Sequence, residues 1–177
     1  MNRLTYVLEW LSSGDCVEKS ELELAYAKSS ISEDRYHILE AINLALHDEV
    51  SWPSPAERDN LSSPYQGIFK GVVGVFDVTE WQITRSIDPV KEYQTFSGKV
   101  RLNTMKTLAV IDRHGKFIWI GKAIDGRTAD RNCWTQSDLY MDAGDYFSPG
   151  ERLASDGGFK VSNHHPPPIP PLPHPAT

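Results

Sequence analysis

The chain has 177 residues, of which 40% are hydrophobic and 24% charged, and its formal net charge is -6. This composition is ordinary for a globular protein. It excludes a disordered low-hydrophobicity chain, and a membrane protein is also excluded because the longest apolar runs are too short to cross a bilayer. The acidic balance excludes a protein that coats nucleic acid through an overall positive field, so any DNA contact has to come from local basic clusters.

The N-terminus starts directly with an amphipathic pattern and shows no signal peptide, so we expect an intracellular protein. Cys16 and Cys133 lie far apart in the sequence and belong to no paired ligand spacing. The cysteines therefore predict neither a zinc site nor a disulfide framework, and we expect both thiols to be packed or unused.

Residues 1–62 predict a helical segment. The apolar spacing predicts helices over residues 4–11, 18–28, 30–50 and 57–61. Ser30 and Glu33 have the spacing of a capping box, which would begin the third of these helices. Ser54 followed by Pro55 would cap the fourth.

The third predicted helix has the place of a recognition helix in a helix-turn-helix, the element that enters the major groove of DNA. Its charged residues are mostly acidic, and Arg35 is its only lysine or arginine. Acidic side chains are repelled by phosphates. Of the two interpretations, a working DNA-binding module and a degenerate one that now packs as a helical cap, we therefore favour the degenerate module.

After residue 65 the pattern changes from helical to extended. It predicts strands over residues 71–78, 106–112, 116–123 and 152–155, and a helix over residues 129–140. His114-Gly115 is a tight-turn dipeptide that joins the two middle strands into a hairpin. The predicted fold class is α+β, with the helical segment over residues 1–62, an incomplete mixed sheet over residues 66–162 and a disordered Pro-rich C-terminal tail over residues 163–177.

The tail over residues 163–177 carries seven prolines between Pro166 and Pro175. Such a segment forms neither a regular helix nor a paired strand, and exposed polyproline II is expected. Two interpretations stay open: a tail without function, such as a frameshift would leave, and a ligand for proline-binding domains. The histidines of the tail predict no metal site, because nothing in the sequence holds them in place.

Two aspartates stand at the ends of predicted strands. Asp77 ends the apolar strand over residues 71–78, and Asp156 follows the strand over residues 152–155. A carboxylate that emerges from an apolar strand has to be hydrogen-bonded or hold a cation, since burying it unpaired is costly. The pair could converge on Mg²⁺ or Mn²⁺, which prefer carboxylate oxygens. On spacing alone, we favour the interpretation that the two aspartates only cap turns.

Four blocks of sequence carry a resemblance to one family. Residues 74–83 resemble the first-aspartate motif of the DDE superfamily endonucleases, which are related to Harbinger-type transposases. Residues 93–106 are similar to the block of that family with a tyrosine, Ser-Gly-Lys, a threonine and a lysine. Residues 125–130 resemble the next element, and residues 153–159 resemble the second-aspartate motif. The resemblance covers roughly residues 4–160 and keeps the family's order of motifs.

The resemblance implies a ribonuclease-H-like sheet that holds Mg²⁺ or Mn²⁺ through Asp77 and Asp156, with Asp130 as an auxiliary acidic residue. It implies cleavage or transfer of DNA phosphodiesters. The implied partners are transposon ends or other duplex DNA, together with a homo-oligomer or a full-length transposase, and no membrane. The implied location is the nucleus if the source is a eukaryote.

The chain also departs from the family pattern. The third carboxylate of the family is a glutamate beyond the second aspartate, but neither glutamate nor aspartate follows Asp156 here. Glu80 and Ala129 stand where histidines are usual, and Arg127 stands where a small serine is usual. We therefore expect a truncated copy that lacks cleavage and strand-transfer activity and keeps weak metal binding. The alternative is a non-catalytic, transposase-derived interaction or DNA-binding protein.

Lys99, Arg101 and Lys106 predict a basic strip beside the second strand, extended by Arg113 and Lys116. One interpretation is contact with DNA phosphates near the metal site. The other is a solvated strand edge protected by lysines. Because the last elements of the family fold are absent, we also expect the sheet to have an uncovered edge or face.

Overall fold

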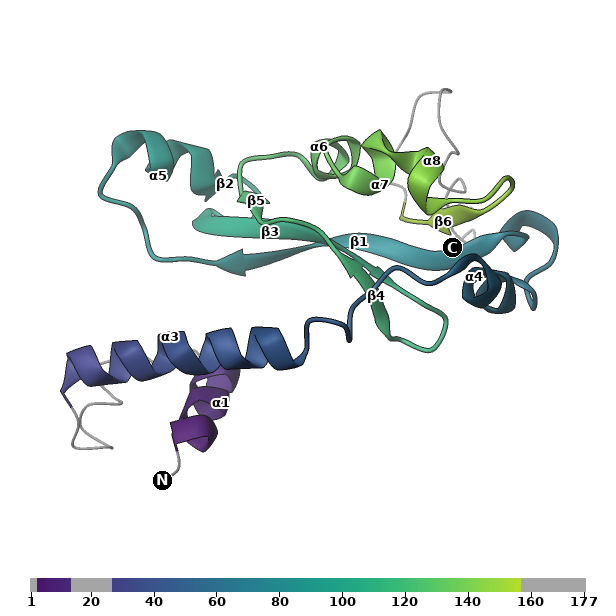
Figure 1. The fold of residues 1–177 in the computed structure, drawn as a ribbon. Coiled ribbons are helices and arrows are strands. Elements are labelled where there is room, and N and C mark those ends of the chain that lie inside the picture. The colour runs from purple at the N-terminus through teal and green to yellow at the C-terminus, as the bar shows by residue number, and fades with distance from the viewer. Residues whose placement is uncertain (1–2, 14–26, 157–177) are drawn as a thin grey trace, which may run out of the picture. The chain divides into compact units, whose positions relative to one another are not determined.

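The computed structural model describes residues 3–13 and 27–156 (Figure 1). Contacts within the chain divide it into two compact units, residues 1–49 and residues 50–177. Most of the helix expected over residues 18–28, and the whole proline-rich tail over residues 163–177, lie outside the described residues. No helix in the described part of the chain is long and apolar enough to cross a membrane.

The first unit contains two described helices, α1 (Arg3–Ser13) and α3 (Lys28–Ala45). They pack against each other through a small core of Tyr6, Val7 and Ile31. The expected helix over residues 4–11 is therefore confirmed, although its leucines contribute less to this core than the tyrosine and valine do.

Arg35 of α3 is buried inside the first unit. Its Nε donates a hydrogen bond of 2.6 Å to Tyr6 Oη, and its guanidinium lies 4.2 Å from the centre of the Trp10 ring. Arg35, the one basic residue expected in the third predicted helix, is thus used for packing within the first unit.

The start of α3 differs from the prediction. The helix begins at Lys28 with Ala27 as its N-cap residue, and no side chain caps it. Ser30 and Glu33 therefore lie inside the first turns, where their backbone N–H groups cannot form the expected capping box. The prediction of a capping box at Ser30 is wrong, because the helix already begins two residues earlier, at Lys28.

The second unit is built on a mixed sheet, as expected. Its strands are β1 (Val72–Gln82), β2 (Phe96–Ser97), β3 (Leu102–Ile111), β4 (Phe117–Ile120), β5 (Ile124–Asp125) and β6 (Arg152–Ala154). β1 lies between β3, to which it is antiparallel, and β6, to which it is parallel. β2, β4 and β5 all pair with β3 in antiparallel fashion.

Both long strands exceed the predicted lengths. β1 continues to Gln82 because it pairs without interruption with β3, from Val75 opposite Ile111 to Gln82 opposite Thr104. The predicted hairpin between β3 and β4 is confirmed. Gly115 in its turn has a φ of 80°, which glycine adopts without strain.

The remaining elements of this unit are short helices. They are α4 (Pro55–Ser62), a 3-10 turn η1 (Gly67–Phe69), α5 (Pro89–Thr95), α6 (Asp130–Thr135), α7 (Asp138–Met141) and α8 (Ala143–Tyr146). Figure 1 shows α6, α7 and α8 together on one side of β1 and β3. The single helix expected over residues 129–140 is broken at Ser137, whose hydroxyl donates a 2.7 Å hydrogen bond to the carbonyl of Trp134.

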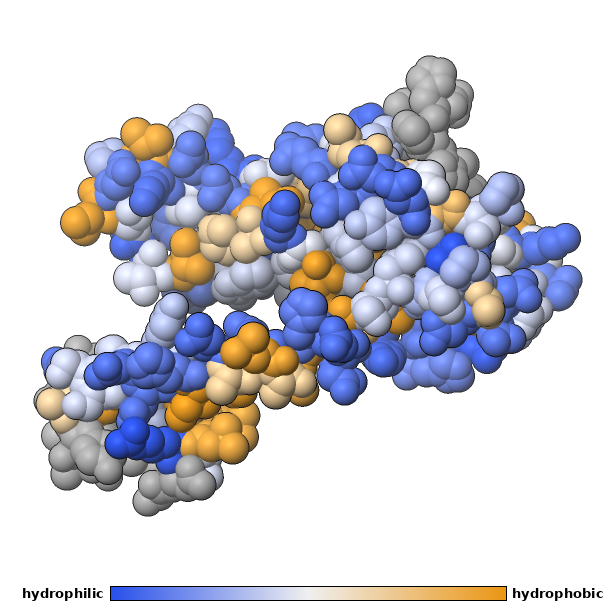
Figure 2. Space-filling model, viewed as in Figure 1, coloured by the Kyte–Doolittle hydropathy of each residue, from blue (hydrophilic) through white to orange (hydrophobic). Residues whose placement is uncertain are grey.

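The core of the second unit lies between the sheet and these three helices. Phe76 of β1 stacks on Trp134 of α6, with 4.4 Å between the ring centres, and Leu108, Val110 and Leu139 pack around the pair. Each such side chain stabilises the fold by about 1.5–3 kcal/mol relative to an exposed position. The core therefore covers one face of the sheet, while the surface view shows hydrophobic areas left exposed among hydrophilic ones (Figure 2).

α4 is tied to the chain segment just before β6. Ser54 and Glu57 form a capping box at its start, as the sequence predicts. Arg58 is buried and donates a 2.7 Å hydrogen bond to Glu151 Oε2, and a second one of 3.1 Å to Ser148 Oγ. This contact fixes the point at which the chain enters β6.

Candidate metal and nucleic-acid site

Asp77 lies in the middle of β1 and is exposed. Its Oδ1 accepts a 2.7 Å hydrogen bond from the backbone N–H of Val78. Its neighbour Phe76 points into the core beneath α6, so the alternation of a strand directs Asp77 to the opposite face of the sheet. The carboxylate is therefore held on the face that the three helices do not cover.

Asp156 stands just beyond β6, and it is also exposed. The parallel ladder between β1 and β6 sets Val75 opposite Ala154. Asp77 and Asp156 both come two residues after this pair. The ladder ends at this pair and Asp156 lies beyond it; continued for two more residues, the same register would set Asp156 next to Asp77 on the same face of the sheet.

This pair of carboxylates suits a hard divalent cation. Mg²⁺ is commonly bound by one or two carboxylates and keeps several waters, and Mn²⁺ accepts the same oxygen ligands. Asp77 and Asp156 would hold such an ion. In residues 3–13 and 27–156, no group of three or more histidine, cysteine, aspartate or glutamate side chains is arranged to bind a metal.

Asp130, the predicted auxiliary residue, is engaged in an ion pair. Its Oδ1 lies 2.9 Å from Lys106 Nζ, which also donates a 3.0 Å hydrogen bond to the carbonyl of Thr128. Lys106 is the cross-strand partner of Glu80, and Glu80 is three residues from Asp77. Alternation puts this group on the helix-covered face, so the structure does not bring Asp130 together with Asp77 and Asp156.

Lys106 is 5% exposed, and both of its short contacts are made inside the protein. The expectation that it belongs to an exposed basic strip is wrong. Its side chain enters the covered face because residues 104, 106, 108 and 110 of β3 alternate into the interior. The partners responsible, Asp130 and Glu80, are distant in sequence, so the strand pattern alone did not identify them.

Glu80 is a functional candidate that the sequence reasoning treated only as a departure from the family. Its Oε1 accepts a 2.7 Å hydrogen bond from Thr104 Oγ1, and Oε2 lies 4.0 Å from Lys106 Nζ. Burial opposes ionisation of Glu80, but hydrogen bonds from Ser97 and Thr104 and the charge of Lys106 outweigh it and lower its pKa. We call Glu80, Lys106 and Asp130 the ionic cluster.

Gly126 packs tightly beside the ionic cluster. A Cβ at this position would collide with the side chain and carbonyl of Thr104 and with the carbonyl of Thr95. The following residue, Arg127, places its guanidinium 3.8 Å from the centre of the Tyr93 ring. The unusual arginine is therefore accommodated by stacking on an exposed tyrosine of the preceding block.

Lys99 and Arg101 remain exposed in the tight turn between β2 and β3. Arg101 has a φ of 60°, and its backbone N–H donates a 2.8 Å hydrogen bond to the carbonyl of Ser97, which closes the turn. Arg113 and Lys116 are exposed at the opposite end of β3. The basic strip is thus divided into two separate ends, and DNA contact by Lys99 and Arg101 stays a prediction.

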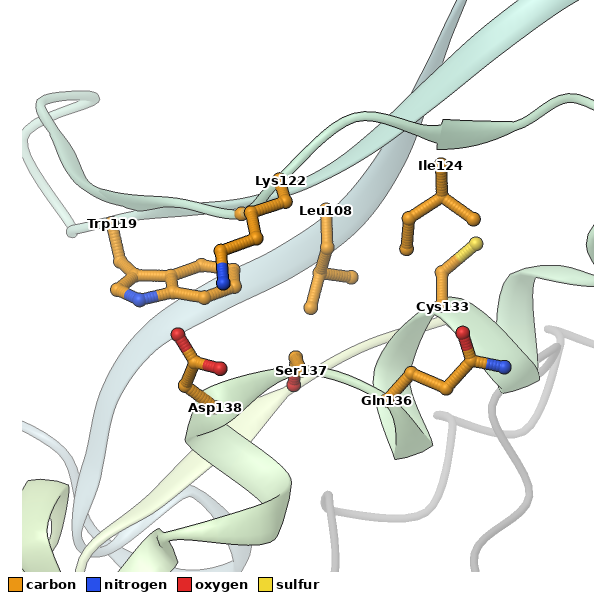
Figure 3. Close-up of a pocket in the computed structure, with 9 residues that line it drawn as sticks. Leu108, Trp119, Lys122, Ile124, Cys133, Gln136, Ser137 and Asp138 are labelled. Carbon is orange, nitrogen blue, oxygen red and sulfur yellow. The ribbon is translucent and has the colours of Figure 1, made fainter.

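A pocket of about 200 Å³ opens between the sheet and α6 and α7. Figure 3 shows Leu108 and Trp119 on the sheet side, with Cys133, Ser137 and Asp138 on the helix side. Burial raises the pKa of the Cys133 thiol, which is fully buried. Cys133 therefore stays protonated and packed, in agreement with an unused thiol.

Comparison with known proteins identifies a family for the chain. No curated protein and no solved structure matches the chain. The family described as DDE superfamily endonuclease matches residues 76–171, more than half of the chain, and this region contains Asp77, Asp130 and Asp156. The chain therefore belongs to the DDE superfamily of endonucleases.

Proposed function

We propose that this protein is a transposase-derived DDE endonuclease that binds a divalent metal through Asp77 and Asp156 and takes duplex DNA as its partner. One observation carries the assignment of these residues: the parallel register of β1 and β6, with Val75 opposite Ala154. Continued two residues past this pair, the same register would bring two exposed carboxylates that are far apart in the sequence next to each other. Turn-capping aspartates would have no reason to share a register.

The chain's own groups have distinct roles in this proposal. Mg²⁺ or Mn²⁺, when bound, activates the attacking oxygen and stabilises the leaving oxygen of a phosphodiester. Asp77 and Asp156 would hold the ion, and the hydrogen bond from the Val78 N–H orients the Asp77 carboxylate. The ionic cluster acts from the other face, where it fixes β1 and β3 against α6.

We further propose that this chain alone binds metal weakly and does not cleave DNA efficiently. Two carboxylates leave more of the coordination sphere of the metal ion to water than three would. Water ligands are not fixed by the protein, so they would not hold the ion in a defined position at the phosphodiester. In the described part of the chain, no third acidic side chain joins Asp77 and Asp156. A second copy of the chain or another transposase is the partner that would complete the site.

Manganese binding tests the site directly. Titration of the full chain with Mn²⁺, followed by electron paramagnetic resonance, should show one weak site that Asp77→Asn and Asp156→Asn each remove. Asp145→Asn is the matched control, because Asp145 is an exposed aspartate of α8 on the helix-covered side. Equal Mn²⁺ binding by all four proteins would contradict the assignment.

A plasmid-nicking assay with Mg²⁺ or Mn²⁺ tests the second part. We expect no nicking by the purified chain above the level of Asp77→Asn. Metal-dependent nicking that Asp77→Asn abolishes would instead show that two carboxylates from this chain suffice for cleavage.

A non-catalytic DNA-binding protein is the second candidate. The observation that favours it is the exposed turn with Lys99 and Arg101, which lies apart from the two aspartates on the sheet. If DNA binding persists in the variant with both Asp77→Asn and Asp156→Asn but falls when the turn is neutralised, this alternative is favoured. For either function we propose an intracellular protein that is nuclear in a eukaryote, because its partner is DNA.

A further inference from the structure

Four apolar side chains lie together on the sheet face that carries Asp77. Val75 of β1 is opposite Ile111 of β3, which is opposite Phe117 of β4. In the next row Asp77 is opposite Ala109, which is opposite Ile120. We call Val75, Ile111, Phe117 and Ile120 the apolar patch.

The apolar patch is exposed to an unusual degree for a sheet face. Its four side chains are between 37% and 49% exposed, whereas Phe76 and Val110 on the other face are almost completely buried. Single exposed apolar residues are ordinary, but a contiguous group marks a surface that binds something. Helices α6 to α8 lie on the opposite side, where Trp134 stacks on Phe76, so they do not cover the patch.

We propose that the C-terminal segment of this same chain, residues 159–175, docks on the apolar patch. The place where the chain leaves the sheet supports this occupant. Ala154, at the end of β6, is the Cα partner of Val75, which belongs to the patch. The described chain therefore leaves the sheet next to the patch, and the sequence that follows begins with Gly157-Gly158, a dipeptide that permits a turn.

The length of the segment is sufficient. The patch spans β1, β3 and β4, or two strand spacings of about 4.8 Å each, which is roughly 10 Å. A polyproline II helix advances about 3.1 Å per residue, so three or four residues cross the patch. The segment is several times longer than this distance, and residues 159–165 can serve as the connection.

The chemistry of the segment matches the patch. It contains Phe159, Val161, Ile169, Leu172 and seven prolines. Prolines donate no backbone hydrogen bond and cannot extend the sheet as a further strand, but a polyproline II segment packs its rings on aromatic surfaces such as Phe117 with little loss of entropy. The segment contains Lys160 and no acidic residue, and Asp77 is a negatively charged side chain in the second of the two rows.

Attachment to the same chain favours this occupant over a second copy. A segment that starts beside its site is present there at an effective concentration on the order of millimolar, so a weak apolar contact suffices. A second copy would have to supply a self-complementary surface large enough for a stable dimer.

Photo-cross-linking in the full chain tests the proposal. With p-benzoylphenylalanine in place of Phe117, we expect the cross-linked peptides to come from residues 159–175. A mixture of ¹⁵N-labelled and unlabelled chains should give cross-links within one copy only. The matched control carries the same group in place of Met141, an exposed residue of α7 on the helix-covered side, and should not reach this segment.

A second variant tests the contact without altering the sheet. Ile169→Asp together with Leu172→Asp should lower the cross-linking yield by about tenfold or more, since each substitution removes an apolar anchor. Thr177→Asp should leave the yield unchanged. Cross-links from position 117 to a second copy or to another segment, or a yield that the double substitution does not change, would overturn the proposal.

The readout also separates this inference from the metal site. Asp77→Asn should leave the cross-linking pattern as it is, because no ion is needed for the contact. Loss of Mn²⁺ binding with an unchanged cross-link, or the reverse, therefore shows which of the two proposals fails.

Discussion

Lys106 Nζ and Asp130 Oδ1 lie 2.9 Å apart, and the ion pair joins the middle of β3 to the first residue of α6. Asp130 is the residue that the family resemblance marked as auxiliary, and Lys106 is the lysine that ends the preceding block of the resemblance. Their contact makes the pair a support for the packing of α6 on the sheet. The pair is distinct from the exposed carboxylates on the other face.

Lys106→Met should destabilise the protein by about 3 kcal/mol, because removal of one partner leaves Glu80 and Asp130 without their buried cation. Asp130 is partly exposed, so the loss is expected at the low end for a buried pair. Urea unfolding measures it. Lys99→Met, at an exposed lysine, is the control and should change the unfolding free energy by no more than about 0.5 kcal/mol.

The stability of the protein should fall in acid partly because of Glu80. Its folded pKa lies below the ordinary value of 4.5, so its contribution is complete above about pH 4.5 and is lost as the pH falls through the folded pKa. Urea midpoints measured from neutral pH to about pH 3 should fall less steeply in Glu80→Gln. An equally steep fall in the variant would contradict this. Part of the pH dependence should remain in Glu80→Gln, because the pKa of Glu57 is also lowered.

Ser54→Ala should destabilise the protein by about 1 kcal/mol, since it removes the side-chain half of the capping box of α4. Ser54→Asp should retain most of the stability, because aspartate is also a good N-cap residue. Thermal unfolding of the three proteins measures the difference. If both substitutions cost the same, the hydroxyl contact with Glu57 is not what stabilises this helix.

Gly126→Ala should destabilise the protein by about 1–3 kcal/mol, because the added methyl group collides with Thr104 and with the backbone of Thr95. Gly144→Ala is the control: a Cβ there meets nothing within 4 Å. Chemical unfolding should show no more than about 0.5 kcal/mol for the control. Equal stability of the two variants would mean that the space around Gly126 adapts at no cost.

DNA binding should depend on the turn between β2 and β3. Lys99→Ala combined with Arg101→Asn removes two positive charges, and asparagine tolerates the positive φ at position 101. If both residues contact phosphates, the slope of log affinity against log salt should fall by about 1.8, as about 0.9 is expected for each contact. An unchanged slope in a fluorescence-anisotropy titration would show that the turn is only a solvated edge.

Several parts of the fold follow from short-range sequence patterns. The hairpin around Gly115 and the capping box at Ser54 were predicted correctly, because turn and cap residues act on neighbours a few positions away. Asp77 was expected at the end of its strand, but β1 continues to Gln82 and places Asp77 in the middle, while Asp156 follows β6 as expected. For these two residues the sequence supplied motifs, and the ladder between β1 and β6 supplied the register.

The errors involve contacts between distant residues. Lys106 was expected on the surface because its partners Glu80 and Asp130 are 26 and 24 positions away, and no local pattern indicates which face of a strand becomes covered. One error has a local cause instead. The predicted helix over residues 129–140 is broken at Ser137, where the hydroxyl donates a hydrogen bond to the carbonyl of Trp134. Serine forms such bonds inside continuous helices as well, so the sequence did not require an interruption.

The buried contact between Arg58 and Glu151 has a consequence for the order of folding. It joins residues 93 positions apart, and β6 enters the sheet immediately after it. Hairpin contacts between β3 and β4 close a short loop, whereas this contact must close a long one and should form later. Asp156 follows β6 and therefore also reaches its place late, so chains caught early in refolding should contain the hairpin but not the pairing between β1 and β6.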